Sequence, residues 1–295
     1  MNITFLGTGA AEMNPNPFCN CSHCETARKL ISEGKRKPRR RSCAMLGTRT
    51  CVDFGPDVMA SVMDFGVSFT ELRSIFITHT HEDHLSFSNI NVHSMTARPS
   101  EHAVTVYMSP EGFRWLFGLM AESKHHSPVT GMEDLIKRNL VRFAPFEPYR
   151  DHKIDGMIVF AVQSNHMSYG EGEYALNYRF TFPDGKRLLY VADSGLYSED
   201  NLKALEGSSC DVLIMESTRG IMETPEHHSH LNGLNFIENV RRFSEYGIIS
   251  PDAKIYATHL ATSTDNYLSD EDFENRLKEG DGRIILAYDG MKADL

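Results

Sequence analysis

Four side chains of metal-ligand type lie within six positions of the chain. They are His79, His81, Asp83 and His84, in the spacing H-x-H-x-D-H, and they follow an apolar run at 75–77 that predicts a buried strand. Side chains two positions apart at a strand end point to the same side, so His79 and His81 can share one ion. Asp83 and His84 can then face a second ion. Imidazole and carboxylate ligands suit zinc, manganese or iron. A histidine-rich surface loop is the plainer alternative, but the density of ligands favours a metal site.

Three later residues of the same chemical types each follow an apolar, strand-like segment. His166 follows the run at 158–162, Asp193 follows 188–192, and His259 follows 255–258. Taken singly, each is typical of a hydrogen-bonded loop residue. Taken together, in this order and each at the end of an apolar strand, they strengthen the resemblance described next.

The motif and the order of these strand ends resemble the metallo-β-lactamase superfamily, whose signature is H-x-H-x-D-H at a strand end. The resemblance runs from residue 3 to about residue 262. It implies an α/β fold of the four-layer αββα sandwich type and a dinuclear centre with a hydroxide between the ions. It also implies a ligand set: His79, His81 and His166 on one metal, Asp83, His84 and His259 on the other, and Asp193 bridging both. Asp53 is our candidate for orienting one of the imidazoles, with the capping of a turn as the alternative.

Three further segments narrow the resemblance to one branch. Phe5-Leu6-Gly7-Thr8-Gly9, the Cys19-x-Cys21-x-x-Cys24 run and Asp53-Phe54-Gly55-Pro56-Asp57 resemble the group containing phosphoribosyl 1,2-cyclic phosphate phosphodiesterase. That group is related to the tRNA 3′-processing endonucleases and to the pyrroloquinoline-quinone biosynthesis B protein.

In this branch the cysteine run holds a structural zinc, so the resemblance implies a third metal at Cys19, Cys21 and Cys24. A closed structural site needs four ligands. The histidine that the family supplies as the fourth is Thr262 here. The fourth ligand is therefore left open between His23, Cys43 and another side chain, and three free thiols remain an alternative.

A second histidine cluster precedes a predicted amphipathic helix at 233–243. Asn232 has the type and position of its N-cap. The resemblance implies that a histidine just before this helix acts as a general acid or contacts the phosphate, a role that suits its near-neutral pKa. His230 matches best and His228 second, with an exposed polar loop as the alternative. His230 and Asp83 are thus the candidate catalytic residues.

Two other features allow either a functional or a plainer interpretation. The basic run at 35–41 carries six positive charges. A solvated loop is the plainer interpretation, whereas Arg40 or Arg41 at the site entrance would attract an anionic substrate. Tyr169 and Tyr174 follow His166 and can line a pocket or belong to the core.

The elements expected around these residues alternate without strict βαβ order, which favours a layered α/β protein. We expect one domain over 1–295, with a cysteine-bearing N-terminal loop at 13–42 and an insertion at 109–155. Strands are expected at 2–6, 43–53, 74–79, 103–108, 157–163, 176–182, 187–192, 211–215, 253–258 and 283–288. Helices are expected at 57–65, 110–121, 132–138, 200–205, 233–245 and 270–278.

Composition limits the class of protein and of partner. The 295 residues are 41% hydrophobic and 24% charged, as in globular proteins. The net charge of −10 repels phosphate polymers and disfavours nucleic acid as a partner, but it allows a small anionic substrate beside bound metals. No apolar stretch approaches the roughly 18 residues of a membrane span, so we expect a soluble, cytoplasmic protein without a membrane partner. A homodimer is compatible with these features.

These residues predict a metal-dependent hydrolase with two divalent ions, zinc or manganese. The resemblance favours a phosphodiesterase acting on a small or cyclic phosphodiester through a metal-bridging hydroxide. Three alternatives stay open: a lactone, thioester or amide hydrolase of the same fold, a tRNA-processing nuclease, and a non-catalytic cofactor-biosynthesis protein. The chain lacks the Gly/Pro-rich arm with which the nucleases grip tRNA.

Overall fold

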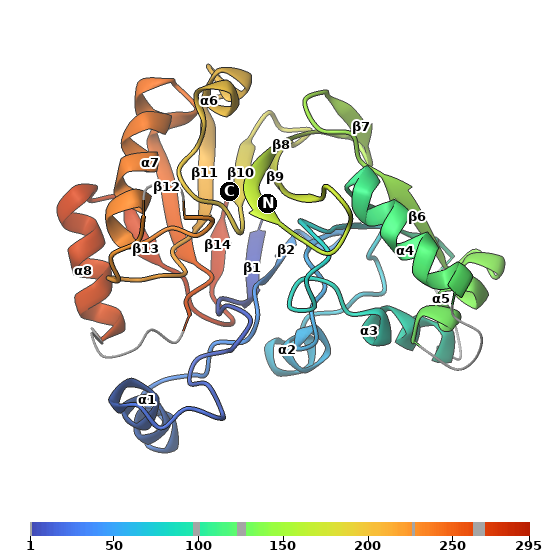
Figure 1. Ribbon diagram of the computed structural model, residues 1–295, viewed down its shortest axis with the longest axis horizontal. Coiled ribbons are helices and arrows are strands. Elements are labelled where there is room, and N and C mark those ends of the chain that lie inside the picture. Colours follow the sequence, from blue (N-terminus) through green and yellow to red (C-terminus); the bar gives the residue numbers. More distant parts are fainter. Residues whose placement is uncertain (1, 97–100, 123–127, 226–227, 262–268) are drawn as a thin grey trace.

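Two seven-stranded sheets pack face to face in the computed structural model, which describes residues 2–96, 101–122, 128–225, 228–261 and 269–295. Helices cover the outer face of each sheet, so the chain forms four layers (Figure 1). The expected αββα sandwich is confirmed.

The first sheet has the strand order β14-β1-β2-β3-β4-β5-β6, and the second has the order β13-β12-β11-β10-β9-β8-β7. The strands are β1 (Asn2–Gly7), β2 (Cys43–Leu46), β3 (Thr50–Val52), β4 (Ser74–Phe76), β5 (Val104–Met108), β6 (Val141–Pro145), β7 (His152–Ile154), β8 (Met157–Met167), β9 (Tyr174–Thr181), β10 (Arg187–Val191), β11 (Cys210–Glu216), β12 (Ile249–Thr258), β13 (Ile284–Leu286) and β14 (Lys292–Asp294). The helices are α1 (Ser22–Ser32), α2 (Val58–Phe65), α3 (Phe87–Asn91), α4 (Pro110–Glu122), α5 (Pro128–Lys137), α6 (Glu199–Leu205), α7 (Gly233–Glu245) and α8 (Asp270–Gly280), with a 3₁₀ turn at Val92–Met95.

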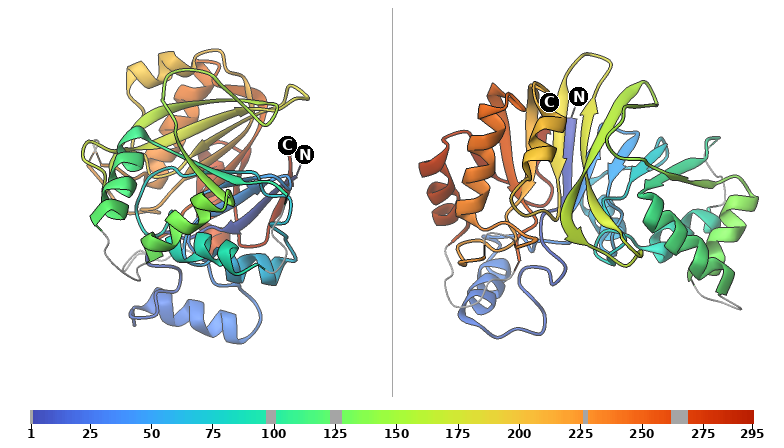
Figure 2. Two further views of the ribbon diagram at one scale, coloured as in Figure 1. Left: turned by 90° about the vertical axis from the view of Figure 1, so that its right-hand side faces the viewer. Right: turned by 45° about the horizontal axis from the view of Figure 1, so that its top comes forward.

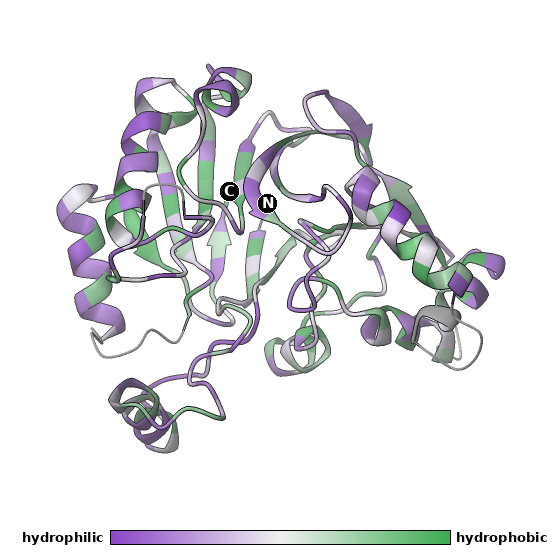
Figure 3. Ribbon diagram, in the orientation of Figure 1, coloured by the Kyte–Doolittle hydropathy of each residue, from purple (hydrophilic) through white to green (hydrophobic). Residues whose placement is uncertain are grey.

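Three separate apolar clusters hold the four layers together. The cluster between the sheets is rich in aromatic rings, among them Phe76, Tyr178 and Phe180. A second cluster packs helices α6, α7 and α8 against the second sheet. A third cluster packs helices α2, α3, α4 and α5 against the first sheet. Figure 3 shows hydrophobic colour concentrated along the strands and hydrophilic colour along the outer helix faces. Burial of both sheet faces explains why several strands are apolar throughout rather than alternating.

The topology brings the ends of several strands to one edge of the sandwich. In the first sheet β3, β4, β5 and β6 run parallel, and in the second β10, β11, β12 and β13 do so. β8 pairs antiparallel with β9, and β9 antiparallel with β10, so β8 and β10 point the same way. The loops after β4, β8, β10, β11 and β12 therefore start at neighbouring points, which is where open α/β sheets carry their sites.

The segment at 13–42 differs from the loop expected there. It contains the 11-residue helix α1, which projects from the body of the molecule in two views (Figures 1 and 2). The helix is polar, with only His23, Cys24 and Ala27 buried, which is why its apolar pattern is too weak to predict it.

Two other sequence expectations need correction. The single strand expected at 43–53 is two antiparallel strands, β2 and β3, joined by a turn at Gly47, whose φ of 66° favours glycine. The stretch at 109–155 holds α4 and α5 as expected, but it also contributes a strand to each sheet, β6 and β7.

The basic run at 35–41 is solvated only in part, because Lys35 and Lys37 are exposed whereas its arginines make contacts within the fold. Arg39 is 2% exposed, and its guanidinium donates to the Thr8 hydroxyl, to the Ala287 carbonyl and to Asp270. Its neighbours Arg40 and Arg41 form ion pairs with Asp64 and Asp57. The run therefore ties the N-terminal segment to α2 and to the start of α8.

Within the described ranges, no helix has the length and apolar character that crossing a bilayer requires.

Candidate metal centre

The loop after β4 is folded tightly enough to present its four candidate ligands together. The amides of His84 and Leu85 both donate to the carbonyl of His81, which closes a turn. Gly55 lies against this turn, and a Cβ there would sit 2.0 Å from the carbonyl oxygen of Asp83. Only glycine allows the two loops to approach so closely.

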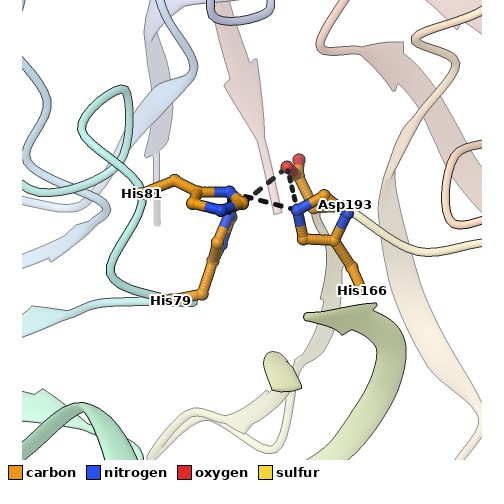
Figure 4. Close-up of side chains that lie close together, drawn as sticks. All are labelled: His79, His81, His166 and Asp193. Carbon is orange, nitrogen blue, oxygen red and sulfur yellow. Dashed lines mark hydrogen bonds and ion pairs between the residues drawn. The ribbon is translucent and has the colours of Figure 1, made fainter. Parts of the chain in front are cut away.

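The first ligand group consists of His79, His81, His166 and Asp193, which converge in Figure 4. Nδ1 of His81 lies 2.9 Å from Nε2 of His79 and 3.2 Å from Nε2 of His166. Oδ2 of Asp193 lies 3.4 Å from Nε2 of His79 and 3.5 Å from Nε2 of His166. These four side chains come from the ends of β4, β8 and β10.

The second ligand group consists of Asp83, His84 and His259. Nε2 of His84 lies 3.2 Å from Oδ2 of Asp83, and Nε2 of His259 lies 3.7 Å from the same oxygen. Asp193 reaches this group as well, because its Oδ1 lies 3.0 Å from Nε2 of His259. Asp193 is thus the one carboxylate of the two groups that touches both.

Hydrogen bonds fix which ring nitrogen each buried histidine turns inward. Asp53 accepts from the amide and hydroxyl of Thr78 and lies 2.8 Å from Nδ1 of His84, so that nitrogen carries the proton. The Thr218 hydroxyl donates to Glu216 and lies 2.8 Å from Nδ1 of His259. In both rings Nε2 is therefore the nitrogen turned toward the ligand groups, as a metal ligand requires. Asp53 thus contacts the imidazole of His84, as an orienting residue would, and its effect on metal binding stays a prediction.

Buried polar atoms without hydrogen-bond partners show that the site fits metal ions. Among the described residues they include Nε2 of His84, Nε2 of His259 and Oδ1 of Asp193, which face one another. Orphaned buried atoms of this kind are costly unless something absent from the protein chain satisfies them. Burial and the neighbouring His84 also lower the pKa of His79 well below its usual value, which keeps its ring neutral.

Glu216 is a site residue that we did not identify from the sequence. This fully buried carboxylate at the end of β11 lies 3.0 Å from Nδ1 of His230, and it accepts from the amides of Ser194 and Thr218. Burial opposes the charged form of His230, but Glu216 outweighs it and raises the pKa of His230 to about 9. The ring of His230 lies beside those of His166 and His259, at centroid distances of 4.7 and 6.0 Å.

The backbone at the site is unusual at three positions. Asp53, Asp193 and His259 have φ values of 61°, 41° and 56° although none is glycine. Such conformations cost roughly 1–3 kcal/mol each and concentrate at functional sites.

The model of one protein family, described as anti-Pycsar protein Apyc1, matches residues 44–243, more than half of the chain. The chain belongs to the Apyc1 family. The matched region contains every side chain of the two ligand groups except His259. A comparison with curated proteins gives no match.

Solved structures share the fold of this Apyc1-family chain. A diphosphatase of the PhnP family has a TM-score of 0.70 at 18% identity, covering 100% of this chain and 97% of its own. Zinc-bound PqqB from Methylobacterium extorquens has a TM-score of 0.69 at 16% identity, with both chains fully covered. The metallo-β-lactamase fold protein YhfI from Bacillus subtilis has a TM-score of 0.68 at 16% identity, with 99% of both chains covered. The metallo-β-lactamase fold expected from the sequence is confirmed, and the family match names Apyc1 rather than the cyclic phosphate phosphodiesterase branch.

The Apyc1-family chain has two exposed tyrosines after β8, of which Tyr169 lies beside a ligand. Tyr169 is half exposed, and its ring lies 4.9 Å from that of His81 and 5.8 Å from that of Trp115, so it is no core residue. Tyr174 is 37% exposed and is no core residue either. His228 lies 3.4 Å from the guanidinium of Arg219 and bonds the backbone of His230. His227 lies outside the described residues.

Three of the six cysteines of the Apyc1-family chain form a separate group on the projecting segment. The sulfur atoms of Cys19, Cys21 and Cys24 lie within 4.8 Å of one another. Neither suggested fourth ligand joins them. Nε2 of His23 bonds Asn14, and Cys43 lies 3.5 Å from Cys51 in the first sheet. Thr262 lies outside the described residues.

Proposed function

We propose that the chain is a dinuclear metal-dependent phosphodiesterase acting on a small or cyclic phosphodiester. The observation that carries this proposal is the convergence of two ligand groups on one shared carboxylate, Asp193, with His230 beside them. His79, His81 and His166 would hold one divalent ion, zinc or manganese, and Asp83, His84 and His259 the other. Bound there, the two ions would polarise the phosphoryl oxygens and activate water as the nucleophile.

The protein's own groups then account for proton transfer and orientation. His230 is the general acid, because its ring is held by Glu216 and its raised pKa keeps it protonated at neutral pH. Nδ1–H of His230 donates to Glu216, so Nε2–H is the bond that faces the leaving oxygen. Asp83 and Asp193, with their side chains nearly fully buried, place negative charge where the two cations would sit.

The first test combines elemental analysis of the purified chain with hydrolysis of bis-(p-nitrophenyl) phosphate in added zinc or manganese. We expect about two metals per chain at the catalytic groups and measurable turnover. His230→Ala should retain the metals and lose most of the turnover, whereas the matched control His93→Ala, outside the site, should retain both. Unchanged turnover in His230→Ala would remove that residue from the mechanism. Failure to bind metal after reconstitution would refute the proposal.

The same centre could in principle attack a carbonyl, so lactone, thioester and amide substrates belong in the panel, as does precursor tRNA. Metal binding with turnover of one of those substrates and none of the diester would reassign the reaction. Metal binding without hydrolysis of any of them would favour a non-catalytic role.

We also propose an anti-Pycsar role for the chain, exercised through this hydrolysis. Its support is membership of the family named for an anti-Pycsar protein. Co-expression with a Pycsar system tests it, with Asp193→Asn as the variant expected to lose the effect.

A further inference from the structure

Arg219 brings a positive charge to the loop that joins β11 to α7, close to the proposed general acid (Figure 1). Four arginines of the described part of the chain have a buried Nε without a hydrogen-bond partner. Three of them, Arg36, Arg39 and Arg179, form ion pairs with aspartates. Arg219 is the fourth, and its half-buried guanidinium forms no ion pair with any described carboxylate. Buried charged groups are normally paired, so this one has capacity for a partner from outside the chain.

His228 turns a second hydrogen-bond donor toward this guanidinium. Burial, and then the charge of Arg219, lower the pKa of His228, so its ring has a single proton at neutral pH. The amide of His230 donates to Nδ1 of His228 at 3.0 Å, while the His230 carbonyl lies 3.2 Å from the same nitrogen. Nδ1 can serve only one of the two, and the amide contact is the shorter, so the ring proton is on Nε2. Nε2 of His228 lies 3.4 Å from Nη2 of Arg219. Two N–H donors therefore face each other, and an anionic oxygen that accepts from both would complete the arrangement.

The segment that carries His228 is fixed against the strand ends of the metal centre. Nδ2 of Asn165, near the end of β8, donates to the His228 carbonyl at 3.3 Å. A Cβ on Gly195, just after β10, would lie 2.0 Å from the same carbonyl oxygen, so only glycine allows this approach. The rings of His228 and His230 lie 6.0 Å apart. The pair of Arg219 and His228 is thus one ring away from the general acid, and a substrate whose leaving oxygen meets His230 can extend toward it.

We propose that Arg219 and His228 form a subsite for a second phosphate group, carried by the leaving portion of the substrate. Nη2 of Arg219 and Nε2 of His228 would donate to its oxygens, and the guanidinium would offset part of its charge. The inference rests on the proposed phosphodiesterase and adds a substrate class to it, namely diesters whose leaving portion also carries a phosphate monoester. The net charge of −10 disfavours such a substrate over the chain as a whole, so a local positive group is what would select it.

Two cyclic diesters that differ only in a remote phosphate test the subsite. Adenosine 2′,3′-cyclic phosphate and its 5′-phosphorylated form have the same scissile bond, and the released oxygen stays on the ribose that carries the 5′-phosphate. We expect the metal-loaded chain to prefer the 5′-phosphorylated form about 10- to 100-fold in kcat/KM, mainly through KM, as charge-assisted hydrogen bonds would produce.

Variants at the two residues then assign the preference. In Arg219→Met it should fall to about one. His228→Asn keeps an acceptor near the position of Nδ1 but has no Nε2, so the preference should fall in part. The control Arg150→Met removes an exposed arginine and should retain the full preference. Because the preference is a ratio measured on one protein, a general loss of activity in a variant does not imitate the expected result.

The outcomes separate this proposal from the phosphodiesterase on which it rests. A wild-type preference of about one would overturn the subsite, and so would a preference that Arg219→Met leaves unchanged. In both cases the two cyclic phosphates are hydrolysed, so the proposed phosphodiesterase would stand. If neither is hydrolysed, calorimetric titration of the metal-free chain with D-ribose 5-phosphate decides. Binding that is lost in Arg219→Met and retained in Arg150→Met supports the subsite, whereas no binding, or equal binding to both variants, overturns it.

Discussion

Replacement of Glu216 by glutamine should move the alkaline limb of the pH–rate profile to lower pH. Glu216 is fully buried, and its carboxylate raises the pKa of His230 to about 9 against the effect of burial, which lowers it. Glutamine keeps the shape but removes the charge, so the pKa of His230 should fall to its usual value of about 6.5 or below. That fall of about 2.5 units corresponds to about 3.4 kcal/mol of lost interaction between the pair.

The consequence for rate follows from the fraction of His230 that carries a proton. A general acid with a pKa of about 9 is about 90% protonated at pH 8, whereas one with a pKa of about 6.5 is about 3% protonated. The variant should therefore be about 30-fold slower at pH 8 and close to wild type below pH 6. Activity that depends on protonated His230 is lost as the pH rises through the pKa of His230. The variant should therefore lose its activity at a lower pH than the wild type.

The assay is kcat for bis-(p-nitrophenyl) phosphate from pH 5.5 to 10 at saturating metal. Cations at the ligand groups lower the pKa of His230 in both proteins. The quantity to compare is therefore the difference in pH between the alkaline limb of the wild type and that of the variant. Glu173→Gln is the matched control, because Glu173 is equally buried but bonds Thr80 and Ser109 instead of a histidine. An equal loss of rate at every pH, with no displacement of the limb, would refute the reasoning. Metal content and melting temperature should be recorded alongside.

Three further predictions follow from contacts around the site and the fold. Asp53→Asn replaces one carboxylate oxygen by an amide donor, so residue 53 can no longer accept from both Thr78 and the His84 ring, and we expect metal affinity to fall about 10–100-fold in competition with a chromophoric chelator; unchanged affinity would leave Asp53 as a turn cap only. Arg39→Met leaves the Thr8 hydroxyl and the Ala287 carbonyl without their buried donor, so urea denaturation should show a loss of about 2 kcal/mol, with little loss in the exposed control Arg150→Met. Dialysis against a chelator should abolish turnover and lower the melting temperature, and zinc or manganese should restore both; turnover that survives metal removal would contradict the metal mechanism.

The ligand groups could be predicted from the sequence because each member follows a short apolar strand. A strand is a local feature, and its end is visible where apolar residues give way to histidine or aspartate. His79, Asp193 and His259 lie just beyond β4, β10 and β12, whereas His166 is the next-to-last residue of β8. The ends of β8, β10 and β12 come together because these strands run in one direction. The roles of these residues in binding metal remain predictions.

The features that the sequence did not reveal depend on distant partners. The basic run at 35–41 was expected to be solvated, because nothing near it in the sequence balances its charge. Its partners Asp57, Asp64 and Asp270 lie 16, 24 and 231 positions away from the arginines that they pair with. Long side chains of this kind become buried only when the fold supplies hydrogen bonds and opposite charge, and neither is visible in local patterning.

Glu216 shows where the strand-end rule stops being sufficient. Like Asp193 it is an acidic residue at the end of an apolar run, so the same signal could have found it. The rule does not tell a metal ligand from a residue that orients one, because the difference depends on register and backbone. Glu216 is still part of β11, paired with Thr258, and it turns both carboxylate oxygens to protein donors, whereas Asp193 lies beyond its strand with a φ of 41° and keeps one oxygen unpartnered. A buried carboxylate that is fully hydrogen-bonded by the protein positions its neighbours, and one left with an orphaned oxygen at the same sheet edge is the one available to a cation.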